Sequence, residues 1–254
     1  MADKNYQVFQ EVYDLLFDKS LYPAWADFCQ EALDRYLPDQ TSYRLMDVAC
    51  GDGEFALEML ERGFDVTGYD LSEEMVSRAQ ERLEEAGYPG RIYQGNMLED
   101  QAVSGFDLVT LFCDSLCYLE SPEELAQCFA AQASLLQAGG LFIFDIHSAY
   151  QMNQVYPGYQ YIEEWDDAVF TWRSEQLRGE GTIDHVLNIF VEDPQTGSYD
   201  RHEELHREQI FPLSVYQDLL QAAGFVDVKL TADFAFEAPG PESQRLFFTC
   251  VKGE

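Results

Sequence analysis

Short runs of apolar residues along the middle of the chain alternate with segments in which apolar residues recur every three or four positions. The runs predict buried strands, at 45–49, 65–69, 91–94, 106–112 and 141–146. The segments between them have the spacing of amphipathic helices, which bury one face. Strands that alternate with helices in this way form right-handed crossover units, so the pattern predicts a parallel sheet with helices on both faces.

The parts that flank this pattern have a different character. Residues 1–40 carry aromatic and aliphatic side chains at helical spacing, which predicts a helical N-terminal cap. Residues 148–207 alternate roughly between apolar and polar side chains and contain turn sequences, which predicts antiparallel hairpins. We interpret this second part as an antiparallel β insertion that lies over the ligand-binding edge of the sheet and acts as a lid on the substrate.

The C-terminal part predicts one more helix and a hairpin. A helical pattern covers 212–223, and two strands follow at 225–234 and 244–251. These strands must pair antiparallel, because a parallel connection needs about a dozen or more residues and usually a helix. The predicted fold is therefore an α/β domain, made of residues 41–147 and 208–254, with a seven-stranded, mostly parallel sheet that ends in an antiparallel hairpin.

The charge of the chain limits the kinds of molecule that it can bind. Lys and Arg number 15 against 47 Asp and Glu, so the formal net charge is −32 and the isoelectric point is near 4.1. Such a field repels polyanions, and binding to nucleic acids or anionic membranes begins with neutralising phosphates. We therefore expect a small-molecule partner, no nucleic acid and no membrane. The sequence leaves open whether the chain forms a homodimer.

The N-terminal residues and the cysteines indicate a cytoplasmic protein that binds no metal. Residues 1–17 mix charged with apolar side chains, so they form neither the apolar core of a signal peptide nor a membrane span. The six cysteines lie in apolar stretches without the spacing of metal ligands. We expect buried free thiols, although Cys113 and Cys117 lie close enough in sequence to leave a pairing open.

A glycine-rich turn after the first predicted strand carries the clearest chemical signal. The run MDVACGDGE places Asp47 in the strand, and Gly51 and Gly53 before the next helix. Glycines allow a ligand to approach the backbone closely, and the start of a helix offers unpaired N–H groups. Asp70 ends the second strand, where its carboxylate can accept both hydroxyls of a ribose. Together these features predict a nucleoside site.

Two kinds of nucleoside cofactor fit this turn. The two glycines and the alanine three residues after them match the dinucleotide pattern G-x-G-x-x-A, so an NAD(P)-dependent oxidoreductase is one alternative. Asp47 instead favours a methionine-containing cofactor, because its charge would repel a pyrophosphate and attract an amino group. Asn96 and Met97, just after the third strand, are placed to contact the edge and the face of an adenine. The chain has no Tyr-x-x-x-Lys pair, which also disfavours the oxidoreductase.

The segment LMDVACGDGEFALEMLERGFDVTGYDLSEEM resembles the class I S-adenosylmethionine-dependent methyltransferases, and the resemblance covers residues 45–146 and the C-terminal hairpin. It implies a Rossmann-like fold and S-adenosylmethionine as the cofactor. In that family the glycine turn wraps the methionine part, and the acid that matches Asp70 holds the ribose. The family usually carries Asp where this chain has Asn96, which can still pair with the adenine amine. The cofactor-binding residues implied here are Asp47, Ala49, Cys50, Gly51, Gly53, Asp70, Leu71, Met75, Asn96 and Met97.

Two further segments resemble the same family. FDLVTLFCDSLCYL resembles the fourth strand and its loop, where Phe112, Cys113 and Asp114 would border the transferred methyl group. VYDLLF, with the aromatic residues that follow it, is similar to the N-terminal cap of small-molecule N-methyltransferases, in which tyrosines close over the cofactor. The resemblance therefore adds Tyr13 and Tyr22 to the cofactor site.

Methyl transfer requires an acceptor atom held in line with the bond that breaks. His147, just after the fifth strand, and Asp114, after the fourth, are candidate general bases for an acceptor that arrives protonated. We therefore expect a methyltransferase that acts on a nitrogen or oxygen of a small molecule. A protein that binds the cofactor without turnover is the remaining alternative. Trp165 and Trp172 either line the acceptor pocket or pack the core of the insertion.

Overall fold

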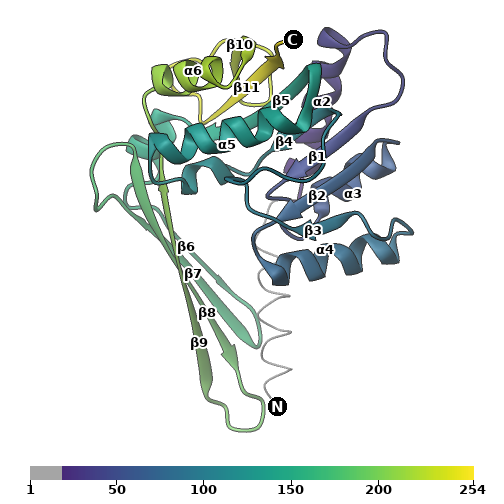
Figure 1. Ribbon diagram of the computed structural model, residues 1–254. Helices are drawn as coiled ribbons and strands as arrows, with labels where there is room; N and C mark the ends of the chain where they lie inside the picture. The colour runs from purple at the N-terminus through teal and green to yellow at the C-terminus, as the bar shows by residue number, and fades with distance from the viewer. Residues whose placement is uncertain (1–18) are drawn as a thin grey trace. The chain divides into compact units, whose positions relative to one another are not determined.

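The structure is a computed structural model that describes residues 19–254 of the chain. Its contacts divide it into two compact units (Figure 1). The larger unit combines Ser20–Ser148 with Phe211–Glu254, and the smaller unit contains Ala149–Ile210. The predicted cofactor residue Tyr13 lies outside the described residues.

The larger unit is built on a seven-stranded sheet with the order β10-β11-β5-β4-β1-β2-β3. Its strands are β1 (Arg44–Val48), β2 (Asp65–Asp70), β3 (Ile92–Gln94), β4 (Phe106–Leu111), β5 (Leu136–His147), β10 (Phe225–Ala232) and β11 (Arg245–Lys252). The first five pair in parallel, whereas β11 pairs antiparallel with both β5 and β10. This arrangement confirms the predicted α/β fold with its C-terminal antiparallel hairpin.

Helices cover both faces of this sheet. They are α2 (Leu21–Tyr36), α3 (Glu54–Glu61), α4 (Glu73–Glu85), α5 (Pro122–Leu135) and α6 (Leu213–Ala222). Successive residues of β5 point to opposite faces, as the period of a strand requires. Leu141 and Ile143 join the core cluster that contains α2, α3 and α4. Phe142 and Phe144 instead pack against Phe129 of α5, and α6 lies beside α5 (Figure 1).

The starts of two helices follow directly from the sequence. The Ser72 hydroxyl accepts the Met75 N–H at 3.3 Å and so caps α4. Ser121 caps α5 in the same way by accepting the Glu124 N–H at 3.2 Å, and a proline occupies the first turn. Acidic residues fill the first turn of both helices, where the helix dipole favours negative charge.

The end of α5 differs from the sequence pattern, in which the Gly139-Gly140 pair is the natural stop signal. The helix ends four residues earlier, at Leu135, and both glycines lie inside β5. The pairing of β5 with β4 shifts register at this point, and Gly139 has a φ of 77°. The glycines therefore form a bulge at the start of the strand rather than a helix end, because only glycine adopts this conformation readily.

The smaller unit is a four-stranded antiparallel sheet with the order β6-β7-β8-β9. Its elements are the π-helical turn η2 (Gln151–Val155), β6 (Gln160–Glu164), β7 (Ala168–Glu175), β8 (Thr182–Glu192) and β9 (Tyr199–Gln209). Buried apolar residues of β7 and β8 form a cluster, and Trp165 and Trp172 pack against it. The alternating pattern thus gives antiparallel hairpins, as predicted, and both tryptophans belong to the packing of this sheet.

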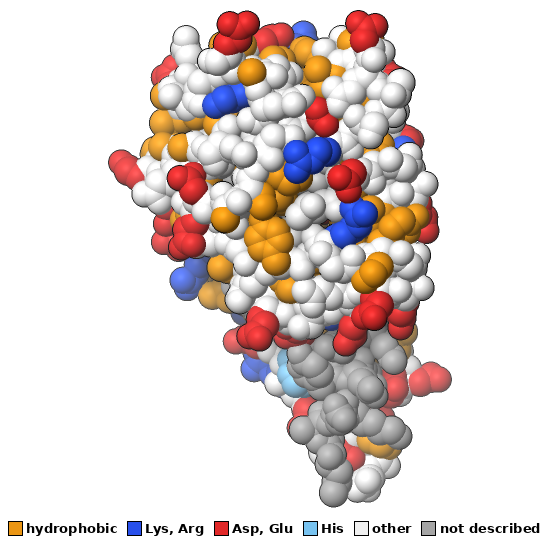
Figure 2. Space-filling view, turned by 45° about the vertical axis from the view of Figure 1, so that its right-hand side comes forward, with side chains coloured by type: hydrophobic (Ala, Val, Ile, Leu, Met, Phe, Trp, Pro, Cys, Tyr) orange, Lys and Arg blue, Asp and Glu red, His pale blue; other side chains and the backbone are white. Residues whose placement is uncertain are grey.

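On the face drawn in Figure 2, Asp and Glu side chains lie at many places among polar and apolar ones. Among residues 19–254, no helix combines the length and the apolar character that crossing a bilayer requires.

Candidate functional site

The turn after β1 contains two glycines with different surroundings. Ala49, Gly51 and Gly53 all have positive φ, of 54°, 54° and 82°. A Cβ added to Gly51 would meet no atom within 4 Å, so this part of the turn faces open space. A Cβ on Gly53 would lie 2.9 Å from the Ala79 Cβ, which means that α4 packs directly on the turn. One glycine therefore leaves room for a ligand, and the other lets two helices meet.

Asp70 holds this turn from the neighbouring strand. Its Oδ2 accepts the Gly51 N–H at 2.9 Å, and its Oδ1 accepts the Ser72 N–H at 2.9 Å. Because β1 and β2 are adjacent and parallel, their carboxyl ends meet at the same edge of the sheet. A carboxylate has about four acceptor sites, so two backbone bonds leave capacity for the hydroxyls of a ligand.

Asp47 is a buried acid, and one of its two carboxylate oxygens has no hydrogen-bond partner among the described residues. Its side chain is 3% exposed, and its Oδ1 accepts the Thr110 hydroxyl at 3.2 Å. Its Oδ2 is buried and has no hydrogen-bond partner among the described residues. Burial raises the pKa of the Asp47 carboxyl to about 8, against the lowering effect of the Thr110 bond. The lone oxygen fits the ammonium group of an amino-acid ligand, which would pair with the ionised form.

The residues after β2 and β3 form the next part of the edge. Leu71 is 67% exposed, and Met75 lies half-buried in the first turn of α4. Asn96 and Met97 are both half-buried. The Asn96 Oδ1 accepts the Leu98 N–H at 3.0 Å, so this side chain shapes its own turn and keeps its amide N–H groups for other partners.

The loop after β4 carries a second left-handed turn. Cys113 and Asp114 have φ values of 56° and 50°. Cys113 is exposed, whereas the other five cysteines are buried, so the expectation of buried thiols is wrong for this one. All six are free, which rules out a bond between Cys113 and Cys117. Burial raises the pKa of the Cys50 thiol well above its ordinary value, which keeps this turn residue unreactive.

Two aromatic residues of α2 lie beside this loop. Trp25 stacks on Phe112, with ring centroids 5.7 Å apart and an interplanar angle of 15°. Tyr22 packs against Trp25 at 5.7 Å. Burial, and then the charge of Asp52 in the glycine turn, raise the pKa of the Tyr22 hydroxyl above its ordinary range, so it remains protonated. The N-terminal helix therefore reaches the same edge of the sheet as the two acids.

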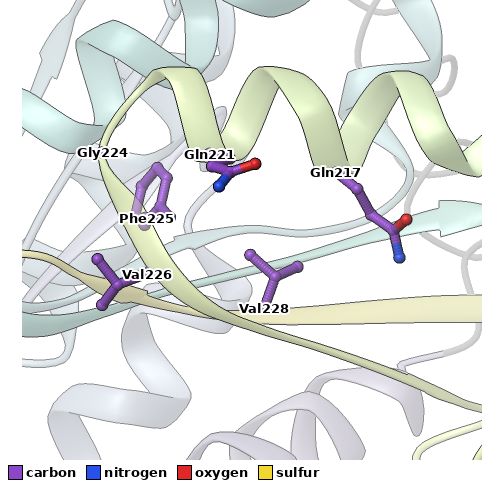
Figure 3. A pocket seen from close by; sticks show the side chains of 6 residues that line it. All are labelled: Gln217, Gln221, Gly224, Phe225, Val226 and Val228. Carbon is purple, nitrogen blue, oxygen red and sulfur yellow. The ribbon is translucent and has the colours of Figure 1, made fainter.

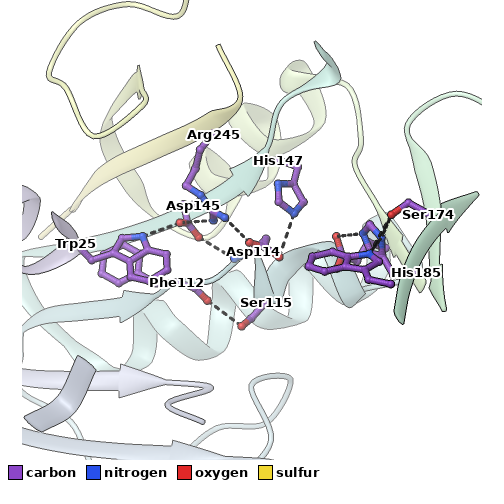
Figure 4. Close-up of polar contacts among 11 residues, drawn as sticks. Trp25, Phe112, Asp114, Ser115, Asp145, His147, Ser174, His185 and Arg245 are labelled. Atoms are coloured by element: carbon purple, nitrogen blue, oxygen red, sulfur yellow. Dashed lines mark hydrogen bonds and ion pairs between the residues drawn. The ribbon is translucent and has the colours of Figure 1, made fainter. Parts of the chain in front are cut away.

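The two candidate bases are brought together. His147 Nε2 lies 3.1 Å from Asp114 Oδ2, and both side chains are largely buried (Figure 4). An imidazole that donates from Nε2 to a carboxylate carries its lone pair on Nδ1. The sequence offers these residues as separate candidates, whereas the structure makes them one pair.

Three residues that were not predicted as site residues complete a buried network around this pair (Figure 4). Arg245 bonds to Asp114 Oδ1 at 2.8 Å and to Asp145 Oδ2 at 2.7 Å. The same Asp145 oxygen accepts the Trp25 indole N–H at 2.8 Å, and its other oxygen accepts the Asp114 N–H at 2.9 Å. One signal was available, because Asp145 is the single charged residue in the apolar run 141–146.

The network sets the charge of its acids. Burial alone would raise the pKa of the Asp114 carboxyl, but the charges of His147 and Arg245 lower it below its ordinary value. Burial raises the pKa of the Asp145 carboxyl, although Arg245 opposes this effect. Asp114 is therefore held as a carboxylate, the form that orients an imidazole.

Comparisons with known proteins agree with this geometry. Residues 45–140 match a family model described as a methyltransferase domain. A protein of Geobacillus sp. (strain WCH70) that bears the name "putative methyltransferase" is 38% identical, over 98% of this chain and 100% of its own length. The chain belongs to the class I S-adenosylmethionine-dependent methyltransferases. This membership decides against the oxidoreductase alternative and against a protein without turnover.

Two more relatives show how the methyltransferase fold is used elsewhere. A protein of Streptomyces fradiae named dTDP-3-amino-3,6-dideoxy-alpha-D-glucopyranose N,N-dimethyltransferase is 27% identical, over 96% of this chain and 90% of its own length. A solved S-adenosylmethionine-dependent methyltransferase from Clostridium acetobutylicum has the same fold, with a TM-score of 0.82 at 24% identity. That comparison covers 98% of this chain and 99% of the other.

A separate groove lies between α6 and β10, at the edge of the sheet. Its volume is about 410 Å³, and it is lined by Gln217, Gln221, Gly224, Phe225, Val226 and Val228 (Figure 3). Three strands separate β10 from β1 in the sheet, so this groove is not part of the methyltransferase site described above.

The two glycines of the turn predict different stability losses when each is changed to alanine. Both substitutions force a side chain into left-handed backbone, which costs about 1–2 kcal/mol. Gly53→Ala also drives a methyl group into α4, and such overpacking adds about 1–3 kcal/mol. We expect urea denaturation to give a clearly larger loss in the free energy of unfolding for Gly53→Ala than for Gly51→Ala. Equal losses would contradict the close approach of α4.

Asp47 predicts a pH-dependent stability. Its folded pKa of about 8 exceeds the ordinary value of 3.8, so between these values the unfolded chain releases a proton that the folded protein keeps. The free energy of unfolding therefore falls as pH rises, by ~1 kcal/mol per pH unit from this group. Asp47→Asn lacks the titration, and the difference between wild type and variant should shrink or reverse between about pH 5 and pH 8 in urea denaturation. Parallel pH curves would show that Asp47 ionises normally.

Proposed function

We propose that this enzyme transfers the methyl group of S-adenosylmethionine to a nitrogen or oxygen atom of a small molecule. The observation that carries the proposal is the pair of acids, Asp47 and Asp70, on either side of an open glycine turn. A ribose with two hydroxyls and an amino-acid ammonium group are the two features that such a pair would bind. When bound, S-adenosylmethionine supplies a sulfonium methyl group that an acceptor attacks in line.

The remaining site residues follow from their places along the same edge. Asp70 binds the ribose hydroxyls, and Asp47 binds the ammonium group. The residues proposed to surround the adenine are Leu71, Met75, Asn96 and Met97. The residues proposed to surround the methionine part and the methyl group are Ala49, Cys50, Gly51, Gly53, Phe112 and Cys113. Tyr22 is proposed to close this site, and the resemblance adds Tyr13, which lies outside the described residues.

An amine is the acceptor that the site favours. Asp114 is held as a carboxylate by Arg245, and it orients the His147 imidazole, which can accept a proton from a protonated acceptor. A net charge of −32 attracts cations and repels phosphate-rich macromolecules. The relative from Streptomyces fradiae, by its name, methylates an amino group of a nucleotide-linked sugar. We infer a small amine, with a hydroxyl as the second choice.

Cytoplasmic location and a homodimer stay predictions from the sequence. The division of labour between a cofactor domain and a lid, with the lid at 148–207, is likewise part of the proposal.

Replacing Asp70 should remove cofactor affinity. Asp70→Ala deletes a charged acceptor for two hydroxyls, and we expect calorimetry with S-adenosylhomocysteine to show binding weaker by roughly 30- to 100-fold. Asp65→Asn, at the opposite end of β2, is the control, because the Asp65 side chain is exposed and bonds only to Arg91 among the contacts described. No heat with the wild-type protein, or equal affinity in Asp70→Ala, would sink the proposed cofactor site.

Replacing His147 should separate chemistry from binding. Production of S-adenosylhomocysteine with a panel of small amines and amino sugars identifies an acceptor, and His147→Gln should then lower kcat by ~10²-fold or more while cofactor affinity stays unchanged. Asp114→Asn should act in the same direction. Asp65→Asn, which lies outside the proposed site, again serves as the control. A His147→Gln enzyme with wild-type kcat across the pH range would show that the acceptor needs no base.

A further inference from the structure

One arginine of α4, Arg82, bonds to the residues of the glycine turn. All three nitrogens of the Arg82 guanidinium donate to residues that flank Gly53. Nε donates to the Asp52 carbonyl at 2.9 Å, Nη2 to the Asp52 carboxylate at 2.6 Å, and Nη1 to the Glu54 carboxylate at 2.8 Å. The planar fork of arginine fixes geometry in a way that a single ammonium cannot.

The Arg82 contacts are one of three sets of contacts that connect the turn with α4. At the start of α4, Asp70 accepts N–H groups from both Gly51 and Ser72, the residue that caps the helix. In the middle, α4 packs on Gly53 so closely that a Cβ there would not fit. In its last turn, Arg82 holds the residues on both sides of that glycine. The turn is therefore tied to one helix at three points along that helix.

We propose that Arg82 is a positioning residue for the cofactor, which fixes the glycine turn at a set distance from Asp70. The proposal rests on the proposed function, because it assumes that the turn and Asp70 bind two ends of one ligand. A ligand held at two points binds tightly only if the protein keeps those points in register before the ligand arrives. Arg82 touches neither end of that ligand and acts through the turn.

A second physical effect of Arg82 makes the opposite prediction. Its charge neutralises Asp52 and Glu54, and removal of the arginine would leave two carboxylates beside the turn. Those charges would attract the cationic sulfonium of S-adenosylmethionine but not the neutral thioether of S-adenosylhomocysteine. Loss of positioning weakens both ligands by the same factor, whereas loss of neutralisation changes their ratio in favour of S-adenosylmethionine.

The test compares Arg82→Gln with Arg62→Gln in the full chain. Arg62 is a close match, since its side chain is 28% exposed against 24% for Arg82, and it also bonds to two carboxylates, those of Asp27 and Glu58. Its bonds join α2 to α3 and do not involve the turn. Isothermal titration with each ligand should show Arg82→Gln weaker by about tenfold for both, with wild-type affinities in Arg62→Gln.

Arg82→Lys keeps the charge but not the fork, so it should recover only part of the loss for both ligands. Thermal unfolding of each variant separates the outcomes, because a purely structural arginine would lower Tm and leave affinity unchanged at temperatures well below Tm. Wild-type affinity in Arg82→Gln, or a gain confined to S-adenosylmethionine, overturns the proposal. A wild-type protein that binds neither ligand overturns the proposed function instead.

A second variant tests the same proposal if Arg82→Gln does not fold. Asp52→Asn combined with Glu54→Gln removes both ion pairs and retains the bond from Arg82 to the Asp52 carbonyl. Its affinity for S-adenosylhomocysteine should fall in the same direction but by less, about threefold. Unchanged affinity in this double variant would also overturn a positioning role.

Discussion

The hydrogen bond from the Gly51 N–H to the Asp70 carboxylate is the contact on which the site depends. It joins the carboxyl ends of two adjacent parallel strands at a glycine that faces open space. The second oxygen of the same carboxylate accepts the Ser72 N–H, where α4 begins. One side chain therefore sets the turn, the start of a helix and the acid that would meet a ribose, and Arg82 closes the arrangement from the far end of that helix.

Buried acids in this protein are accommodated in two different ways. Asp145 is fully buried, but Arg245 and the Trp25 indole pair with it, and Asp114 is paired with Arg245 and His147. An unpaired carboxylate in such surroundings would cost several kcal/mol, about the free energy that holds a small domain together. Asp47 has no cation beside it among the described residues, and burial raises its pKa so that it keeps a proton. Asp47, the acid without a neighbouring cation, is the one that we propose to bind the ammonium group of the ligand.

The parts of the fold that local patterns control were predictable from the sequence. The strands, the serine caps of α4 and α5 and the C-terminal hairpin follow from periodicity and from side chains that bond within a few residues. The bulge at Gly139 was not, because the same glycine pair also ends helices and only pairing with β4 decides between the two. The apolar stretch around Cys113 predicted a buried thiol, but the turn after β4 exposes this side chain.

The buried network shows a second limit of local patterns. Trp25 and Asp145 are 120 residues apart in sequence, and Asp145 and Arg245 are 100 apart. No periodic signal reports such distant contacts. His147 and Asp114 were each predictable from their places after parallel strands, since functional groups gather there. Their bond to each other, and the arginine that keeps Asp114 ionised, required the tertiary structure.

The outward position of Cys113 has a practical consequence. Its five companions are buried, so a thiol-directed dye or spin label would attach to the native chain at a single place. That place is the loop after β4, next to Phe112 and the His147–Asp114 pair. The unmodified protein thus carries one exposed thiol beside the proposed site, and the rate at which that thiol is labelled would report cofactor binding without engineering any other residue.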